Sequence, residues 1–142
     1  MNYLRLIPAA GALALAGCAT VGDLADNRVG QTTLRFANGL PAGTVQLLSN
    51  GQTVTLAVAA TGMSPGEHGF HLHTTGKCTA PGFTSAGGHL NPGNRSHGRL
   101  DPQGPHLGDM TNLQVGADGM VTATVEVPDV RNDALAQIFD AD

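Results

Sequence analysis

The sequence predicts an all-β protein: an antiparallel Greek-key sandwich or barrel, of the immunoglobulin-like type, with one long loop. Three observations support this fold class. Short segments alternate between apolar and polar residues, turn residues separate them, and the 142-residue chain contains 20 Gly and 8 Pro. So much Gly and Pro disfavours a helical bundle and favours short strands joined by turns. A chain of this length suits one domain.

Six segments show the alternation that is typical of strands. They cover residues 31–36, 43–49, 53–60, 68–74, 110–115 and 120–127. The side chains expected to face the core are Val54, Leu56 and Val58 in the third segment and Val121, Ala123, Val125 and Val127 in the sixth. Asn50-Gly51, between the second and third segments, gives the strongest hairpin signal. Six strands are few for a closed barrel, so we expect an exposed sheet edge.

The N-terminal residues predict export rather than a part of the fold. The apolar run from Leu6 to Ala16 is too short to span a bilayer and is typical of a signal peptide. It ends in Leu15-Ala16-Gly17-Cys18, which resembles a bacterial lipobox. The alternative is an ordinary secretory peptide in which the cysteine is coincidental. We expect a lipoprotein signal peptide at 1–17, a lipid on Cys18, a tether at 18–28 and a domain at 29–142.

Lipid attachment implies that the protein lies in the periplasm, anchored to a membrane. Ala19 follows the cysteine where Asp would favour retention at the inner membrane, so the outer membrane is the expected location. The net charge is −4 at pH 7 and no basic stripe is present, which argues against nucleic acid as a partner. Cys78 is then the remaining cysteine of an exported chain, and an odd cysteine there needs an explanation.

All the histidines of the chain lie within one stretch of fewer than forty residues. They are His68, His71, His73, His89, His97 and His106. Imidazole is the commonest protein ligand for zinc and copper, so this distribution predicts a metal site. The stretch from about 75 to 108 has no periodicity, and so long a loop is improbable in a compact domain unless it is functional or tied down.

The spacing of the histidines divides them. His71 and His73 are two apart, so on a strand both point to the same side, whereas His68 faces away and has a supporting or packing role. The alternative for the pair is two surface histidines on a half-exposed strand. Three imidazoles and a carboxylate in the loop would form a tetrahedral zinc set: His89, His97, His106 and Asp109. The alternative there is a solvated loop whose histidines are incidental.

Four motifs, taken in order, resemble those of the copper/zinc superoxide dismutase family. They are G-E-H-G-F-H-L-H at 66–73, T-S-A-G-G-H-L-N-P at 84–92, H-G at 97–98 and H-L-G-D-M-T-N-L at 106–113. Their order and spacing agree with the family across 31–142. The chain is most similar to the bacterial branch, in which a cysteine precedes the S-A-G-G-H segment by several residues, as Cys78 does here.

The resemblance implies a function and a ligand set. His71, His73 and His89 would bind copper, and His89 would bridge to zinc, which His97, His106 and Asp109 complete. The implied activity is the dismutation of superoxide to O₂ and H₂O₂, with copper alternating between Cu(II) and Cu(I). Superoxide would be the small-molecule substrate, and no subunit interface is recognisable in the sequence.

The resemblance also implies features that this chain does not contain. The family pattern has a fourth copper histidine, an arginine that attracts the anionic substrate and a cysteine that pairs with Cys78, and all three would lie beyond Asp142. We therefore expect an incomplete copy whose last strands are missing. Two hypotheses follow: an exported, lipid-anchored copper/zinc superoxide dismutase, or a non-catalytic zinc- or copper-binding lipoprotein on the same scaffold.

Overall fold

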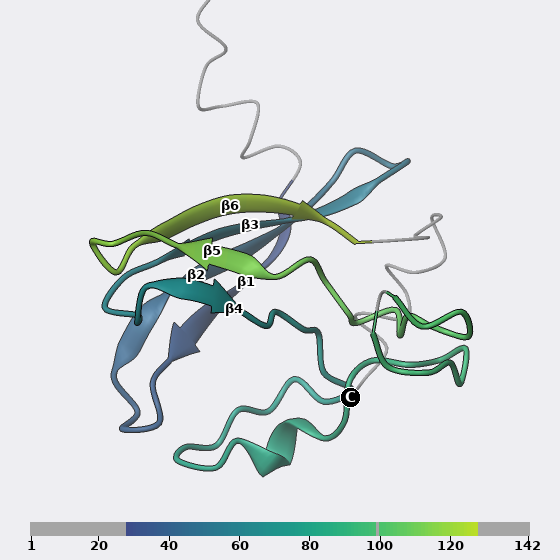
Figure 1. Ribbon diagram of the computed structural model, residues 1–142, viewed down its shortest axis with the longest axis horizontal. Helices are drawn as coiled ribbons and strands as arrows, with labels where there is room; N and C mark the ends of the chain where they lie inside the picture. Colours follow the sequence, from purple (N-terminus) through teal and green to yellow (C-terminus); the bar gives the residue numbers. More distant parts are fainter. Residues whose placement is uncertain (1–27, 99, 128–142) are drawn as a thin grey trace, which may run out of the picture.

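The computed structural model describes residues 28–98 and 100–127, which form two layers of antiparallel strands (Figure 1). The larger sheet has the order β1-β2-β3-β6. Its strands are β1 (Arg28–Arg35), β2 (Pro41–Ser49), β3 (Val54–Ala60) and β6 (Val121–Glu126). The smaller sheet pairs β4 (Gly66–His68) with β5 (Leu113–Val115). The predicted all-β antiparallel class is confirmed.

The core lies between the two layers. In β3 the alternate residues Val54, Leu56 and Val58 are buried, with exposed fractions of 3%, 2% and 2%. They meet the inward side chains of the smaller sheet, Leu113 and Val115, together with further residues from neighbouring segments. The inward faces predicted for the third and sixth segments are confirmed, with Val121, Val125 and Val127 buried and Ala123 packed against the core. β1 is exposed at most positions and has one neighbour, so it is an edge strand.

The loop between β2 and β3 shows why Asn50-Gly51 predicts a hairpin. Gly51 has a φ of +83°, which favours glycine, and Asn50 Oδ1 accepts hydrogen bonds from the N–H groups of Gln52 and Thr53 at 2.9 and 2.8 Å. This turn sets the register in which Val54 pairs with Ser49 and the inward residues of both strands share one face.

The predicted fourth strand, 68–74, is wrong in extent. β4 ends at His68, and the following residues pair only singly, in the isolated bridges His71–Asp109 and His73–His89. The predicted fifth strand, 110–115, is likewise shorter, because β5 begins at Leu113. The backbone of the segment directly after β4 forms its hydrogen bonds with the long loop instead, as Leu72 does with Gly108 and Leu90. This pairing takes the place of a continuous strand.

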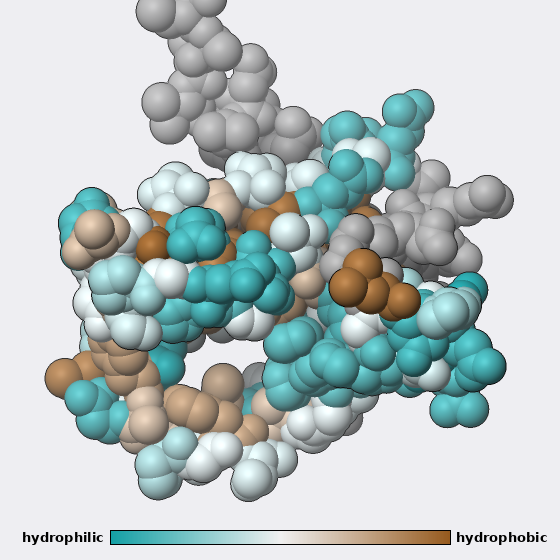
Figure 2. Space-filling view, viewed as in Figure 1, coloured by the Kyte–Doolittle hydropathy of each residue, from teal (hydrophilic) through white to brown (hydrophobic). Residues whose placement is uncertain are grey.

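The long loop contains one short 3-10 helix, η1 (Thr84–Ala86), in its described part. It stands away from the strands, and Figure 2 shows an opening between it and the rest of the surface. Within residues 28–98 and 100–127 no helix is long and apolar enough to cross a membrane. The predicted signal peptide at 1–17, the lipidated Cys18 and the chain after Val127 lie outside the described residues.

Candidate metal centre

Three segments that are distant in sequence meet through a closed ring of backbone hydrogen bonds. Leu72 N–H donates to Gly108 O at 2.9 Å, Gly108 N–H donates to Leu90 O at 2.8 Å, and Leu90 N–H donates to Leu72 O at 2.9 Å. Each of these residues is a direct neighbour in sequence of a predicted ligand. The ring therefore brings the ligands of all three segments to one place.

The close approach at this ring depends on glycine. A Cβ added to Gly108 would collide with the carbonyl oxygen of Leu72 and lie 2.9 Å from the amide nitrogen of Leu90. Any larger residue would push apart the segments that carry His71, His89 and Asp109. Sequence reasoning missed this role, although a glycine placed directly before a predicted ligand is a signal that could have suggested it.

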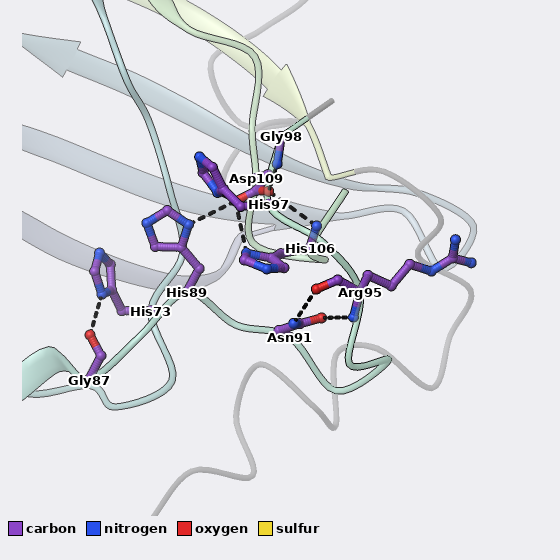
Figure 3. Close-up of polar contacts among 9 residues, drawn as sticks. All are labelled: His73, Gly87, His89, Asn91, Arg95, His97, Gly98, His106 and Asp109. Carbon is purple, nitrogen blue, oxygen red and sulfur yellow. Dashed lines mark hydrogen bonds and ion pairs between the residues drawn. The ribbon is translucent and has the colours of Figure 1, made fainter. Parts of the chain in front are cut away.

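Asp109 is the centre of the cluster. Its Oδ1 lies 2.8 Å from Nδ1 of His89, 3.2 Å from Nδ1 of His97 and 3.4 Å from Nδ1 of His106 (Figure 3). At ordinary zinc bond lengths of about 2.0–2.2 Å, the ligand atoms of a tetrahedral site are about 3.3 Å apart. Each of the three imidazole nitrogens thus lies from the carboxylate oxygen at about the spacing that zinc requires.

The backbone holds the Asp109 carboxylate in its charged form. Asp109 is 2% exposed, and its Oδ2 accepts hydrogen bonds from the N–H groups of Gly98 at 2.9 Å and His106 at 3.1 Å. Burial would raise the pKa of this carboxyl, but these bonds and the one from His89 outweigh it and hold the pKa below its ordinary value. An anionic ligand is therefore available at neutral pH.

His106 supplies a test of whether these residues fit a metal. Its Nδ1 is buried and has no hydrogen-bond partner in the described structure, although it faces Asp109 Oδ1. A buried polar atom without a partner is costly, and such atoms are rare in native proteins. A zinc ion bound by this nitrogen would remove the cost. The donor set of three imidazoles and one carboxylate is also one that zinc accepts.

The other predicted copper ligands, His71 and His73, both border the ring of His89. The ring of His89 is stacked on that of His71, with centroids 4.0 Å apart, and is edge-on to that of His73 at 5.2 Å. His73 Nδ1 donates to Gly87 O at 3.0 Å, which leaves the Nε2 lone pair free for a metal. Burial, and next the neighbouring His89, lower the pKa of His71, which favours the neutral form that binds metals.

The structure brings together six predicted site residues: His71, His73, His89, His97, His106 and Asp109. His68 lies apart from them: its Nε2 is 2.8 Å from Ser64 O and 3.3 Å from Ser64 Oγ. Cys78 is exposed, with no disulfide in the described residues. The supporting groups that the sequence analysis did not identify are mostly backbone atoms, of Gly87, Gly98 and the ring residues, and no side-chain motif reveals them.

The loop between His89 and His97 is closed on itself by Asn91. Asn91 Nδ2 donates to Arg95 O and Arg95 N–H donates to Asn91 Oδ1, both at 2.9 Å (Figure 3). Asn94, inside this loop, has a positive φ of 47°, a conformation that Asn tolerates better than most residues. These two hydrogen bonds fix the turn that leads the chain back toward His97.

Comparison with known proteins agrees with this centre. Residues 41–140 match the family model described as copper/zinc superoxide dismutase (SODC). The superoxide dismutase-like protein YojM of Bacillus subtilis (strain 168) is 33% identical over 144 aligned residues, which cover 91% of this chain and 74% of that protein. Superoxide dismutase [Cu-Zn] 1 of Aquifex aeolicus (strain VF5) is 40% identical over 91 residues, 63% of this chain and 54% of that protein.

A solved structure of a SOD-like protein from Bacillus subtilis superposes with a TM-score of 0.69 at 34% identity and covers 76% of this chain and 73% of that one. Against the Aquifex dismutase the matched part is about half the relative's length. The family match nevertheless covers most of this chain, including every histidine of the metal centre. The chain therefore belongs to the copper/zinc superoxide dismutase family.

Proposed function

We propose that this chain is an exported copper/zinc superoxide dismutase with zinc on one side of His89 and copper on the other. Zinc would be held by His89, His97, His106 and Asp109, and copper by His71, His73 and His89. When bound, copper would supply the one-electron couple for converting superoxide to O₂ and H₂O₂, while zinc, which has no redox chemistry, would fix the geometry.

One observation carries this proposal: a single imidazole belongs to both halves of the cluster. His89 turns Nδ1 toward Asp109 Oδ1 at 2.8 Å, so its Nε2 is directed away from the zinc set. The ring of His71 stacks on the face of His89 with centroids 4.0 Å apart, and that of His73 lies edge-on to it at 5.2 Å, so both other predicted copper ligands border this ring. Without metal, Gly87 O accepts a hydrogen bond from His73 Nδ1 and the Asp109 carboxylate accepts one from His89 Nδ1; zinc would take the place of that His89 proton.

A second candidate is a metal-binding protein without dismutase activity. It is favoured by the extent of the similarity, which spans 74% of the superoxide dismutase-like protein YojM but 54% of the Aquifex dismutase. In the described residues the copper side offers three imidazoles, which would still bind a metal ion.

Metal content and superoxide consumption separate the two candidates. For the dismutase we expect one zinc and one copper per chain and a superoxide-consumption rate well above that of free copper. His73→Ala should abolish copper binding and activity, whereas His68→Ala should preserve both, because His68 contacts Ser64 and not the cluster. One zinc with little copper and a background rate would support the second candidate.

We also propose that the mature protein is lipid-anchored in the periplasm through Cys18. The support is the lipobox-like sequence Leu15-Ala16-Gly17-Cys18 after a short apolar run. Mass spectrometry of the mature N-terminus should find diacylglycerol on Cys18, and Cys18→Ser should release the protein from the membrane fraction. A soluble wild-type protein with an unmodified N-terminus would contradict this.

A further inference from the structure

One side of the metal centre opens into a pocket of about 450 Å³. Three of the six ligand residues line it: His71, His97 and Asp109. His73, His89 and His106 are not among its lining residues. An ion that enters from this side therefore first meets one residue of the copper set and two of the zinc set.

The distances between possible ligand atoms define a group of four residues that includes all three ligands lining the pocket. His71, His89, His97 and Asp109 can each offer one atom such that all four lie within 4.8 Å of one another. A tetrahedral ion needs about 3.3 Å between ligand atoms, so a modest contraction of this group suffices. His97 can contribute to this contraction, because its side chain is 60% exposed and a change of rotamer meets little resistance. This group differs from the zinc set by one residue, with His71 in place of His106.

We infer that the first divalent cation to reach the protein is captured at this pocket by His71, His97 and Asp109, with His89 as the fourth ligand, before it settles in the zinc site. The inference rests on the proposed zinc site. Passage from one set to the other exchanges a single ligand: the bond from the ion to His71 breaks and the bond to His106 Nδ1 forms. That nitrogen already stands 3.4 Å from Asp109 Oδ1 with no other partner. The exchange leaves His71 free for copper.

The charge of the pocket favours entry of cations. Glu67 and Asp101 line it beside the ligands, and among the described residues that line it none is Lys or Arg. Acidic walls raise the local concentration of cations and lower that of anions. The same walls would disfavour superoxide, so this side suits metal loading better than substrate entry.

Stopped-flow uptake of Co²⁺ by the full chain, freed of metal with a chelator, tests the capture step, because Co²⁺ reports tetrahedral N/O coordination by its visible absorption. We expect a fast phase followed by a slower change of spectrum. His71→Ala should slow the fast phase by at least about tenfold, since even residues that only support a ligand change metal affinity about 10–100-fold. His68→Ala is the matched comparison: His68 contacts Ser64 and lies outside both the metal centre and the pocket, so this variant should take up Co²⁺ at the parent rate.

The inference is wrong if His71→Ala and His68→Ala take up Co²⁺ alike, whether both at the parent rate or both slowed. That outcome would not contradict the proposed zinc site, provided that the parent binds one Co²⁺ with a tetrahedral spectrum. A parent without that spectrum would instead overturn the proposed centre. His106→Ala should keep the fast phase and lose the slow one. Circular dichroism of each metal-free variant, with His71→Gln as a substitute for a poorly folded His71→Ala, separates altered loading from unfolding.

Discussion

Asp109 Oδ1 lies 2.8 Å from His89 Nδ1, and this contact decides which edge of the His89 ring faces each half of the metal centre. The carboxylate can take this position because its other oxygen, Oδ2, is held by the backbone N–H groups of Gly98 and His106. The ring of His89 is in turn limited by His71, which stacks on it at 4.0 Å. The arrangement is therefore set by protein contacts that are present without metal.

Asp109→Asn tests how much of the centre depends on this carboxylate. The amide keeps the size but loses the charge and one acceptor, so a buried donor from the backbone or His89 loses its partner. We expect the free energy of unfolding of the metal-free protein to fall by about 1–3 kcal/mol. Zinc affinity should fall by more than about 100-fold, beyond the 10–100-fold typical of residues that only support a ligand.

Urea denaturation and zinc titration against a competing chelator measure the two effects of Asp109→Asn. Glu126→Gln is the control, because Glu126 is an exposed carboxylate at the end of β6 and should change neither quantity. An Asp109→Asn protein that retains parental zinc affinity would remove Asp109 from the ligand set.

The stability of the metal-free protein should fall with acid in two stages. The folded pKa of His71 is lowered from 6.5, so the unfolded chain binds more protons and stability is lost as the pH falls below 6.5. The pKa of Asp109 is also lowered, so its contribution is complete above the unfolded value of about 3.9 and is lost as the pH falls further. Urea denaturation from pH 7.5 to 3 should show both losses. His71→Gln should lack the first stage and Asp109→Asn the second, and a flat profile in the parent would contradict both assignments.

Burial in the core should also be measurable. Leu56 lies at the centre of β3 with 2% exposure, and Leu56→Ala should lower the free energy of unfolding by about 2–5 kcal/mol because it removes buried methyl groups and leaves a cavity. Leu100→Ala is the matched control: Leu100 is 99% exposed, so the change should stay within about 0.5 kcal/mol. Urea denaturation of both variants checks the difference. Equal effects would place Leu56 outside the core.

The faces of the central strands could be predicted from sequence because they depend on a local rule. Alternation of apolar residues at Val54, Leu56 and Val58 fixes which side of β3 is buried, and the structure buries all three. Residue type and motif spacing predicted which side chains gather around Asp109, and the role of these side chains as metal ligands stays a prediction. His68 contacts Ser64 and lies apart from the cluster, but the strand on which its separation from His71 was argued ends at His68.

The end of β4 could not be predicted in this way, because it depends on backbone partners that are distant in sequence. The alternation continues past His68, but the amide of Leu72 bonds to Gly108 and its carbonyl to Leu90, so no regular strand forms. The orientation of the Asp109 side chain could not be predicted for the same reason, because the backbone N–H of Gly98, which is distant in sequence, fixes it. Local patterns report side-chain faces and carry no information about such long-range backbone pairs.

Gly108→Ala tests whether the backbone ring positions the ligands. The added methyl group would collide with Leu72 O and crowd Leu90 N at 2.9 Å, which forces the ring open. We expect the free energy of unfolding to fall by about 1–3 kcal/mol, as overpacking does, and zinc affinity to fall with it although no ligand is changed. Gly88→Ala is the matched control: Gly88 adjoins His89, yet a Cβ there meets nothing within 4 Å. Urea denaturation and zinc titration of both variants decide the matter, since a Gly108→Ala protein that binds zinc as tightly as Gly88→Ala would show that the ring does not hold the ligands in place.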